Sequence, residues 1–202
     1  MISSRSSNIS MALKSITTAL SIAVSTLFLN SAAFAHDLQP FVCTPAGAQD
    51  GTAQFVNSGR KKTYLSLTTV ANGNSSAGAT LTNIDSGKTL TALAFTLSGT
   101  NNPIDGPFAV ITGHFKDGTP VTKVLPCSKA KVLTSSGGTK SLSIGPTELN
   151  LKQTLSVDEC DFELFPGQAN NSTNISNVTI NRSTVVLVTS TNQGCPLGTT
   201  HF

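Results

Sequence analysis

The sequence is poor in aromatic and charged residues. It has no tryptophan, one tyrosine, and charged side chains at 11% of its 202 positions. Saccharide rings are usually held by exposed flat side chains, chiefly Trp and Tyr, so this composition weighs against a carbohydrate-binding surface. Tyr64 lies in an alternating segment with Leu65 and Leu67, where half-buried packing with the hydroxyl at the surface is the expected role.

Catalytic templates are also missing. The chain has no GxSxG or HExxH motif, and no cysteine is paired with a nearby histidine in the manner of a catalytic cysteine. The only basic run, Arg60-Lys61-Lys62, is too short for the basic patch that nucleic acid or an anionic membrane requires. The sequence therefore favours a non-enzymatic protein that does not bind nucleic acid.

The first 35 residues have the pattern of a secretory signal peptide. Lys14 precedes an apolar run from about residue 19 to residue 29, which is followed by the Ala-x-Ala ending Ala33-Phe34-Ala35. We predict cleavage between Ala35 and His36, export to the periplasm or the extracellular space, and a single domain over residues 36–202.

Removal of the leader changes the charge balance. Arg5 and Lys14 leave with it, so 11 of the 13 basic residues remain beside ten acidic ones. After the cleavage site no apolar stretch reaches the 18 residues of a membrane helix, so we expect no transmembrane segment.

Four cysteines, Cys43, Cys127, Cys160 and Cys195, follow the predicted cleavage site. An even number in an exported chain predicts two disulfides and no free thiol. Three pairings are possible. We favour Cys160 with Cys195, because a hairpin near Asn181 would bring Cys195 back toward Cys160, and Cys43 with Cys127 then follows by elimination. The spacings do not fit a zinc site.

The apolar residues recur with a period of two, which predicts an all-β protein. Gly, Asn and Pro clusters separate about ten short segments. The expected strands cover 54–56, 63–68, 80–84, 90–97, 108–111, 121–125, 142–144, 149–155, 162–165, 175–180 and 184–189. Because no helical pattern is available to cover a parallel sheet, we expect an antiparallel β-sandwich, with the jelly roll as a candidate form of it.

The later part of the chain resembles exported bacterial jelly-roll β-sandwich proteins. The resemblance lies in the order of Phe108–Ile111, Lys116-Asp117-Gly118, the acidic segment Leu155–Glu159 and the segment Ile175–Asn181. Such proteins are similar in shape to carbohydrate-binding modules, and many have no assigned activity. The resemblance therefore implies a fold, with a glycan as one candidate partner.

Two histidines raise the possibility of copper. His36 would become the N-terminal residue, whose amine and imidazole can chelate copper together, and His114 could supply a second imidazole to complete a histidine brace. This is the alternative reading of the chain, as a copper carrier or copper oxidase. The simpler expectation is a solvent-exposed His36 and a His114 at a strand end.

Asp158, Glu159, Asp161 and Glu163 place four of the ten acidic residues within six positions. Carboxylates at this density could hold Ca²⁺. Asp161 and Glu163 on one strand face would also lie about 7 Å apart, a separation at which two carboxylates can catalyse glycoside hydrolysis. We prefer a strand with one solvated face. The sequence thus favours a cofactor-free binding, adhesion or envelope-associated module, with copper binding and carbohydrate binding as the alternatives.

Overall fold

The computed structural model describes residues 36–44, 50–57, 59, 63–82, 84, 87–101, 106–166, 170–187 and 195. All of them belong to one compact unit, Ala35–Phe202. The predicted signal peptide lies outside the described residues. Within the described ranges no helix is long and apolar enough to cross a membrane, and the helical structure there is one 3₁₀ turn, η1 (Cys127–Lys129).

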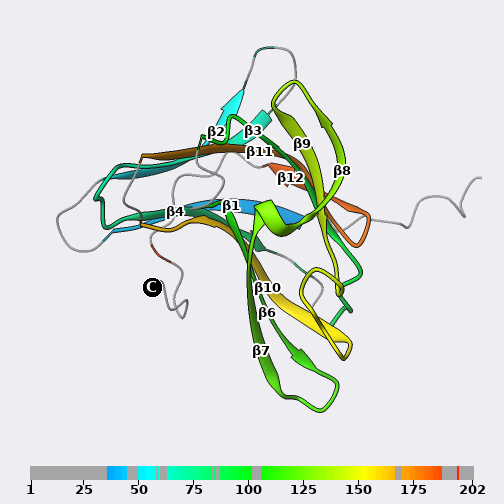
Figure 1. Ribbon diagram of the computed structural model, residues 1–202. Helices are drawn as coiled ribbons and strands as arrows, with labels where there is room; N and C mark the ends of the chain where they lie inside the picture. The colour runs from blue at the N-terminus through cyan, green and yellow to red at the C-terminus, as the bar shows by residue number, and fades with distance from the viewer. Residues whose placement is uncertain are drawn as a thin grey trace, which may run out of the picture. The chain divides into compact units, whose positions relative to one another are not determined.

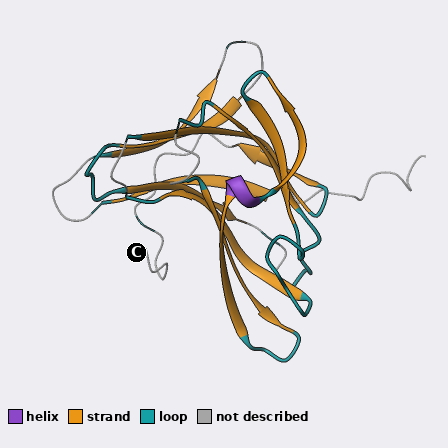
Figure 2. Cartoon of the chain, in the orientation of Figure 1, coloured by secondary structure: helices purple, strands orange, loops and turns teal. Residues whose placement is uncertain are grey.

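The protein is an all-β protein, as predicted, and its strands cover most of the described chain (Figure 2). In chain order the strands are β1 (His36–Cys43), β2 (Gly51–Asn57), β3 (Thr63–Thr69), β4 (Ser76–Thr82), β5 (Leu93–Ser98), β6 (Phe108–Phe115), β7 (Pro120–Pro126), β8 (Lys131–Ser136), β9 (Thr139–Ile144), β10 (Leu155–Leu164), β11 (Asn171–Ile180) and β12 (Ser183–Leu187).

These strands form one sheet that folds back on itself into two layers (Figure 1). The lower layer has the strand order β7-β6-β10-β4-β1. The upper layer contains β2, β3, β11, β5, β9 and β8, and β12 joins the two layers by pairing with β1 and with β11. The β1–β12 pair is parallel and the other described strand pairs are antiparallel, which agrees with the expected sandwich.

The hydrophobic core lies between the layers because alternate residues of each strand point inward. Phe162 of β10 and Phe95 of β5 meet edge to face across the core, with ring centroids 4.8 Å apart, and both are buried. Around them lie Leu38, Leu65 and Ile111, which are fully buried on β1, β3 and β6. Burial of such side chains supplies the main stabilising free energy of the fold.

The segment before β5 is fixed by one asparagine side chain. The Oδ1 atom of Asn181, in the turn between β11 and β12, accepts hydrogen bonds from the backbone N–H and the hydroxyl of Thr91 at 2.7 and 2.8 Å. Its Nδ2 atom donates to the Thr89 carbonyl at 2.8 Å. Asn181 has a φ of 50°, a left-handed conformation that asparagine tolerates better than most residues.

The expected strand at 149–155 is wrong. Residues 145–151 form local turns instead, in which the Leu149 and Leu151 N–H groups donate to the carbonyls of Gly145 and Pro146 at 3.2 and 2.9 Å. Leu149 is buried although it lies in a turn and pairs with no strand. Its apolar side chain packs into the core from this turn, which explains why the sequence suggested a strand here. Two strands were not expected, β1 and β8. All six residues of β8 are exposed, so β8 has no alternation to detect.

The expected disulfide pairing is also wrong. Cys43 at the end of β1 is bonded to Cys195, with their Cα atoms 4.6 Å apart. Cys127 and Cys160 are free and buried among core residues. Cys127 is held in η1, where its N–H donates to the Pro107 carbonyl at 2.8 Å, and Cys160 points inward from β10. The expected pairing rested on a hairpin near Asn181 and on elimination, and neither argument contains information on which face of a strand each cysteine occupies.

The two free thiols give a direct check of this correction. Burial raises the pKa of both thiols, and the charge of Asp161 adds to the effect at Cys160, so neither thiolate forms near neutral pH. We expect alkylation without reductant to label no cysteine in the native protein and two cysteines in denaturant, at Cys127 and Cys160. Peptide mapping that finds no labelled cysteine in denaturant would restore the two-disulfide reading.

Candidate functional site

The candidate site is the outward side of the lower layer, which we call the acidic face. Because strand residues alternate, Leu38, Leu81, Cys160 and Ile111 point into the core, and their sequence neighbours point outward. The outward residues include five carboxylates, from Asp37 on β1 and from Asp158, Glu159, Asp161 and Glu163 on β10.

One end of the acidic face combines a carboxylate with aromatic rings. Glu163 pairs in register with Gly78 on β4 and with Phe108 on β6. A Cβ atom at Gly78 would lie 2.4 Å from Cζ of Phe41, so the absence of a side chain there lets the Phe41 ring cross β4. On the other side, the rings of Phe108 and Phe165 lie 4.8 Å apart, tilted by 38°. Glu163, which is 3% exposed, therefore lies between two aromatic groups.

The centre of the acidic face is Asp161, which pairs in register with Thr80 on β4 and Val110 on β6. Its side chain is 1% exposed, and this burial raises its pKa to about 7. The nearby Thr80 hydroxyl opposes the rise, and the charges of Glu159 and Glu163 add to it. Asp161 therefore titrates near neutral pH.

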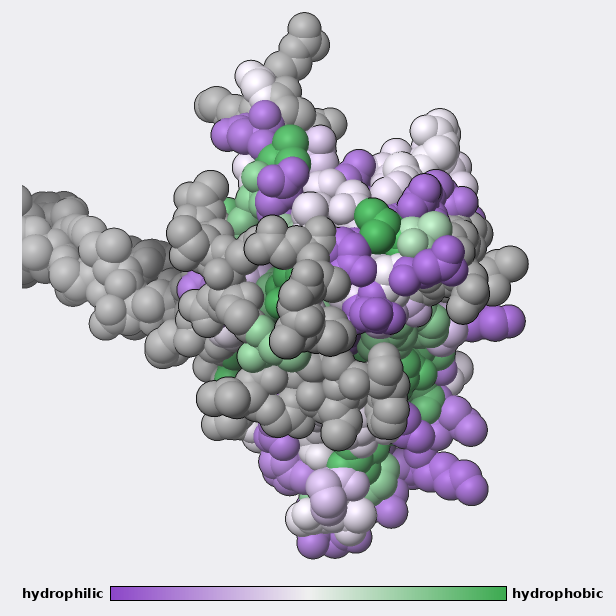
Figure 3. Space-filling model, turned by 90° about the vertical axis from the view of Figure 1, so that its left-hand side faces the viewer, coloured by the Kyte–Doolittle hydropathy of each residue, from purple (hydrophilic) through white to green (hydrophobic). Residues whose placement is uncertain are grey.

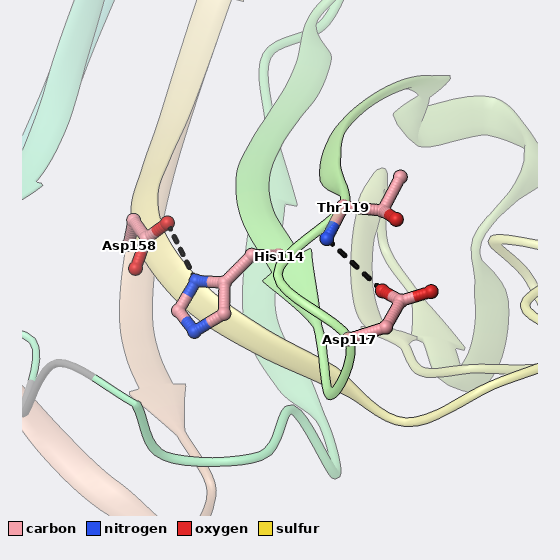
Figure 4. A network of polar contacts seen from close by, with 4 residues as sticks. All are labelled: His114, Asp117, Thr119 and Asp158. Carbon is pink, nitrogen blue, oxygen red and sulfur yellow. Dashed lines mark hydrogen bonds and ion pairs between the residues drawn. The ribbon is translucent and has the colours of Figure 1, made fainter.

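The other end of the acidic face carries a histidine–aspartate pair (Figure 4). The register shift between Val157 and Glu159 turns the Asp158 side chain toward β6, where Oδ2 lies 3.0 Å from Nδ1 of His114. The two side chains are 40% and 49% exposed, so the pair contributes little to stability. The adjacent turn is closed by the Thr119 N–H, which donates to Oδ1 of Asp117 at 3.0 Å.

The structure does not bring His36 and His114 together. His36 begins β1 and His114 lies near the end of β6, with β4 and β10 between these strands, so three strand spacings of about 4.8 Å separate them. His36 is also buried, 5% exposed, on the same side of β1 as Leu38, whereas His114 lies on the acidic face. The expectation of a solvent-exposed His36 is therefore wrong, and this arrangement offers no histidine brace.

The expectation of a solvated carboxylate face on β10 is wrong at its centre. Glu159, Asp161 and Glu163 do share one side of the strand, but Asp161 and Glu163 are buried beneath their neighbours. Successive members of this row are about 6.8 Å apart at the backbone. Within the described residues no group of three or more histidine, cysteine or acidic side chains is placed to hold a metal ion. The four acidic residues suggested as calcium ligands therefore do not form such a group.

The upper layer has a different outward side. Its strands present hydroxyl and amide side chains in a row that crosses from β2 to β8, formed by Gln54, Ser66, Asn174, Ser98, Thr139 and Ser136. None of these side chains is charged. At the end of the molecule drawn in Figure 3, the described hydrophobic residues form small separate areas among hydrophilic ones. The carboxylates of β10 and the Phe108–Phe165 pair, by contrast, lie on the outward side of the lower layer.

Sequence reasoning missed three members of the acidic face. Asp37 is 121 residues from Asp158 in the chain, and only the β1–β4–β10 pairing places both on one layer. Phe108 and Phe165 fall within the expected strands 108–111 and 162–165, but nothing in the sequence indicated that their rings contact each other on the outward side. The acidic run from Asp158 to Glu163 was the available signal, because it marked the strand at the centre of the site.

Neither a protein-family model nor a curated protein sequence matches the chain. Among solved structures, a β-1,2-glucanase from Parabacteroides distasonis is similar with a TM-score of 0.46 and 13% identity over 73% of this chain. The chain spans 24% of that glucanase.

Two structures of a family 11 carbohydrate-binding module from Clostridium thermocellum are similar with TM-scores of 0.40 and 0.42 and identities of 12% and 9%. They cover 71% of this chain and 86% and 88% of the modules, and the second holds a mixed-linked β-1,3-1,4 tetrasaccharide. At these scores the likeness transfers no residue role and no ligand.

Proposed function

We propose that the protein is an exported, non-enzymatic glycan-binding module that holds its ligand on the acidic face. The observation that carries the proposal is the pair of partly exposed rings of Phe108 and Phe165, which lies on the same side of the layer as the half-exposed Glu159. The disulfide between Cys43 and Cys195 supports the exported location, because such bonds persist in oxidising compartments.

The chemistry of this surface suits a sugar. Carboxylate oxygens accept hydrogen bonds from sugar hydroxyls, and these charge-assisted bonds are stronger than neutral ones. The apolar side of a pyranose ring packs on an aromatic ring, and Phe108 and Phe165 are both partly exposed. These two phenylalanines would do here what tryptophan and tyrosine usually do, since the sequence has no tryptophan and one tyrosine.

The same geometry argues against hydrolysis. An acid and a base or nucleophile must both reach the glycosidic bond, whereas Asp161 and Glu163 are 1% and 3% exposed. The accessible groups of the acidic face, Glu159, Asp158 and His114, line its surface as hydrogen-bonding partners. Binding is therefore the function that we propose.

Affinity electrophoresis through gels that contain soluble polysaccharides tests this proposal. We expect at least one polysaccharide to retard the mature protein, and Phe165→Ala to raise the dissociation constant about fivefold, because a ring contact contributes roughly 1 kcal/mol. Tyr64→Ala is the matched control, since Tyr64 is an aromatic residue of β3 in the upper layer. Its affinity should stay within about twofold of the wild type.

Two results would contradict the proposal. One is migration unaffected by every polysaccharide in a panel of neutral, acidic and amine-bearing glycans. The other is loss of binding in Tyr64→Ala with full binding retained in Phe165→Ala, which would place the ligand on the upper layer.

A further inference from the structure

The corner at which the lower layer continues into the upper layer is positively charged. We call residues Lys123–Leu133 the basic corner, which runs from the second half of β7 through η1 into β8 (Figure 2). Its basic residues are Lys123, Lys129 and Lys131. The chain has no acidic residue between Asp117 and Glu148, and within the described ranges none of the three lysines is paired with a carboxylate. The corner therefore attracts anionic groups.

The basic corner also exposes apolar side chains. Five large hydrophobic side chains are exposed among the residues that the structure describes, and three of them are Val124, Val132 and Leu133. Cys127 and Ala130 fill the inner side of the corner, so its other residues face outward. A register shift after Val132 leaves Leu133 without a partner on β9. Apolar side chains gathered at one exposed place indicate an interaction surface.

The two features together indicate the kind of partner. A polyanion would satisfy the lysines, but it would leave the apolar side chains in water. A strand of another protein would cover apolar side chains, but the irregular pairing of β8 and the charge of Lys131 oppose the addition of a strand at this edge. The surface of a bilayer with anionic lipids offers both negative headgroups and, about 5–10 Å deeper, an apolar boundary.

We infer that the basic corner binds a bilayer surface that contains anionic lipids. The lysines would lie among the headgroups, and Val124, Val132 and Leu133 would reach the boundary of the acyl chains. The inference goes beyond the proposed function and does not depend on it. Sequence reasoning looked for an uninterrupted basic run, whereas other residues separate the lysines of this corner.

Sedimentation of the mature protein with sucrose-loaded vesicles in about 0.1 M NaCl tests the inference. One set of vesicles is pure phosphatidylcholine, and the other contains about 30% phosphatidylglycerol. We expect the partition coefficient to be about a hundredfold higher for the anionic vesicles, because each of three lysines near such a surface contributes about fivefold. Raising the NaCl concentration to about 0.5 M should remove most of this difference.

The charge is tested by Lys129→Gln/Lys131→Gln, which should lower the partition coefficient for the anionic vesicles about 25-fold. The control Lys116→Gln/Lys152→Gln removes the same charge next to the other end of β6, about 25 Å from η1 and well beyond the screening length. The partition coefficient of the control should stay within about twofold of the wild type.

The apolar contact is tested by Val124→Thr/Val132→Thr. Threonine keeps the shape and the strand propensity of valine, so both strands should remain folded. We expect the partition coefficient for the anionic vesicles to fall about fivefold, because two methyl groups that enter the boundary are replaced by hydroxyls. The control Val70→Thr/Val186→Thr changes two exposed valines outside the basic corner, and its partition coefficient should stay within about twofold of the wild type.

Four results would overturn the inference. They are no binding to anionic vesicles, equal binding to both kinds of vesicle, binding unchanged in the lysine variant, and binding lowered by the lysine variant alone, which would indicate a partner that is anionic but not a bilayer. A dimer in sedimentation equilibrium that the valine variant dissociates would also overturn it, because a second copy would then cover the corner. The vesicles contain no glycan, so none of these results bears on the proposed function.

Discussion

Cys195→Ser is expected to lower the free energy of unfolding by about 5 kcal/mol. The bond between Cys43 and Cys195 closes a loop with a sequence separation of 152, and the restriction of the unfolded chain grows with loop length. Cys195 is exposed, so the substitution opens no core cavity. Urea denaturation of the wild type and the variant under non-reducing conditions measures the difference in unfolding free energy.

Two further variants test whether this loss comes from the disulfide. The double variant Cys43→Ser/Cys195→Ser should be about as unstable as Cys195→Ser, because both remove the same bond. Reductant should destabilise the wild type by a similar amount and leave Cys195→Ser unchanged. A loss below about 1 kcal/mol in Cys195→Ser would contradict the assigned pairing.

Asp161 is expected to make the protein less stable as the pH rises from about 4 to about 7. Burial raises the pKa of this carboxyl from 3.8 to about 7 in the folded state. Between these values the folded protein holds a proton that the unfolded chain has released, so the free energy of unfolding falls as the pH rises and levels off above about pH 7. The full shift corresponds to about 4 kcal/mol.

Asp161→Asn removes this titration and keeps the shape of the side chain. We expect the variant to be more stable than the wild type at pH 8, by up to about 4 kcal/mol, and to differ little from it at pH 4. Urea denaturation at both pH values measures this. Glu148→Gln, a charge removal in a loop, should keep the wild-type slope between the two pH values. A wild type whose stability rises over this range, or an Asp161→Asn variant with the same slope, would contradict the buried position of Asp161.

The class of the fold was predictable because period-two alternation survives wherever one side of a strand packs on the core. The segment 63–68 illustrates this, since it became β3 with alternating burial. The pattern failed where burial does not alternate. β8 is exposed on both sides, so no strand was expected there. Leu149 packs inward from a turn, and its apolar side chain led to the wrong assignment of a strand at 149–155.

The candidate site was predictable only in its local part. The run from Asp158 to Glu163 is contiguous in sequence, so it identified β10 as the strand with unusual chemistry. Its burial, its neighbours Phe108 and Thr80, and the separation of His36 from His114 depend on strand order, which pairs residues across long stretches of chain. Alternation within one strand contains no information about that order.

Residue-resolved NMR measures the location of the ligand most directly. The mature protein labelled with ¹⁵N would be titrated with the oligosaccharide that it binds most tightly. We predict chemical-shift changes at the backbone amides of Glu159, of Asp161 and of Thr112, which pairs with Glu159 on β6, and at Phe108 and Phe165. The row from Gln54 to Ser136 on the upper layer should be unchanged. Shifts concentrated on the upper layer, with the acidic face unaffected, would contradict the account.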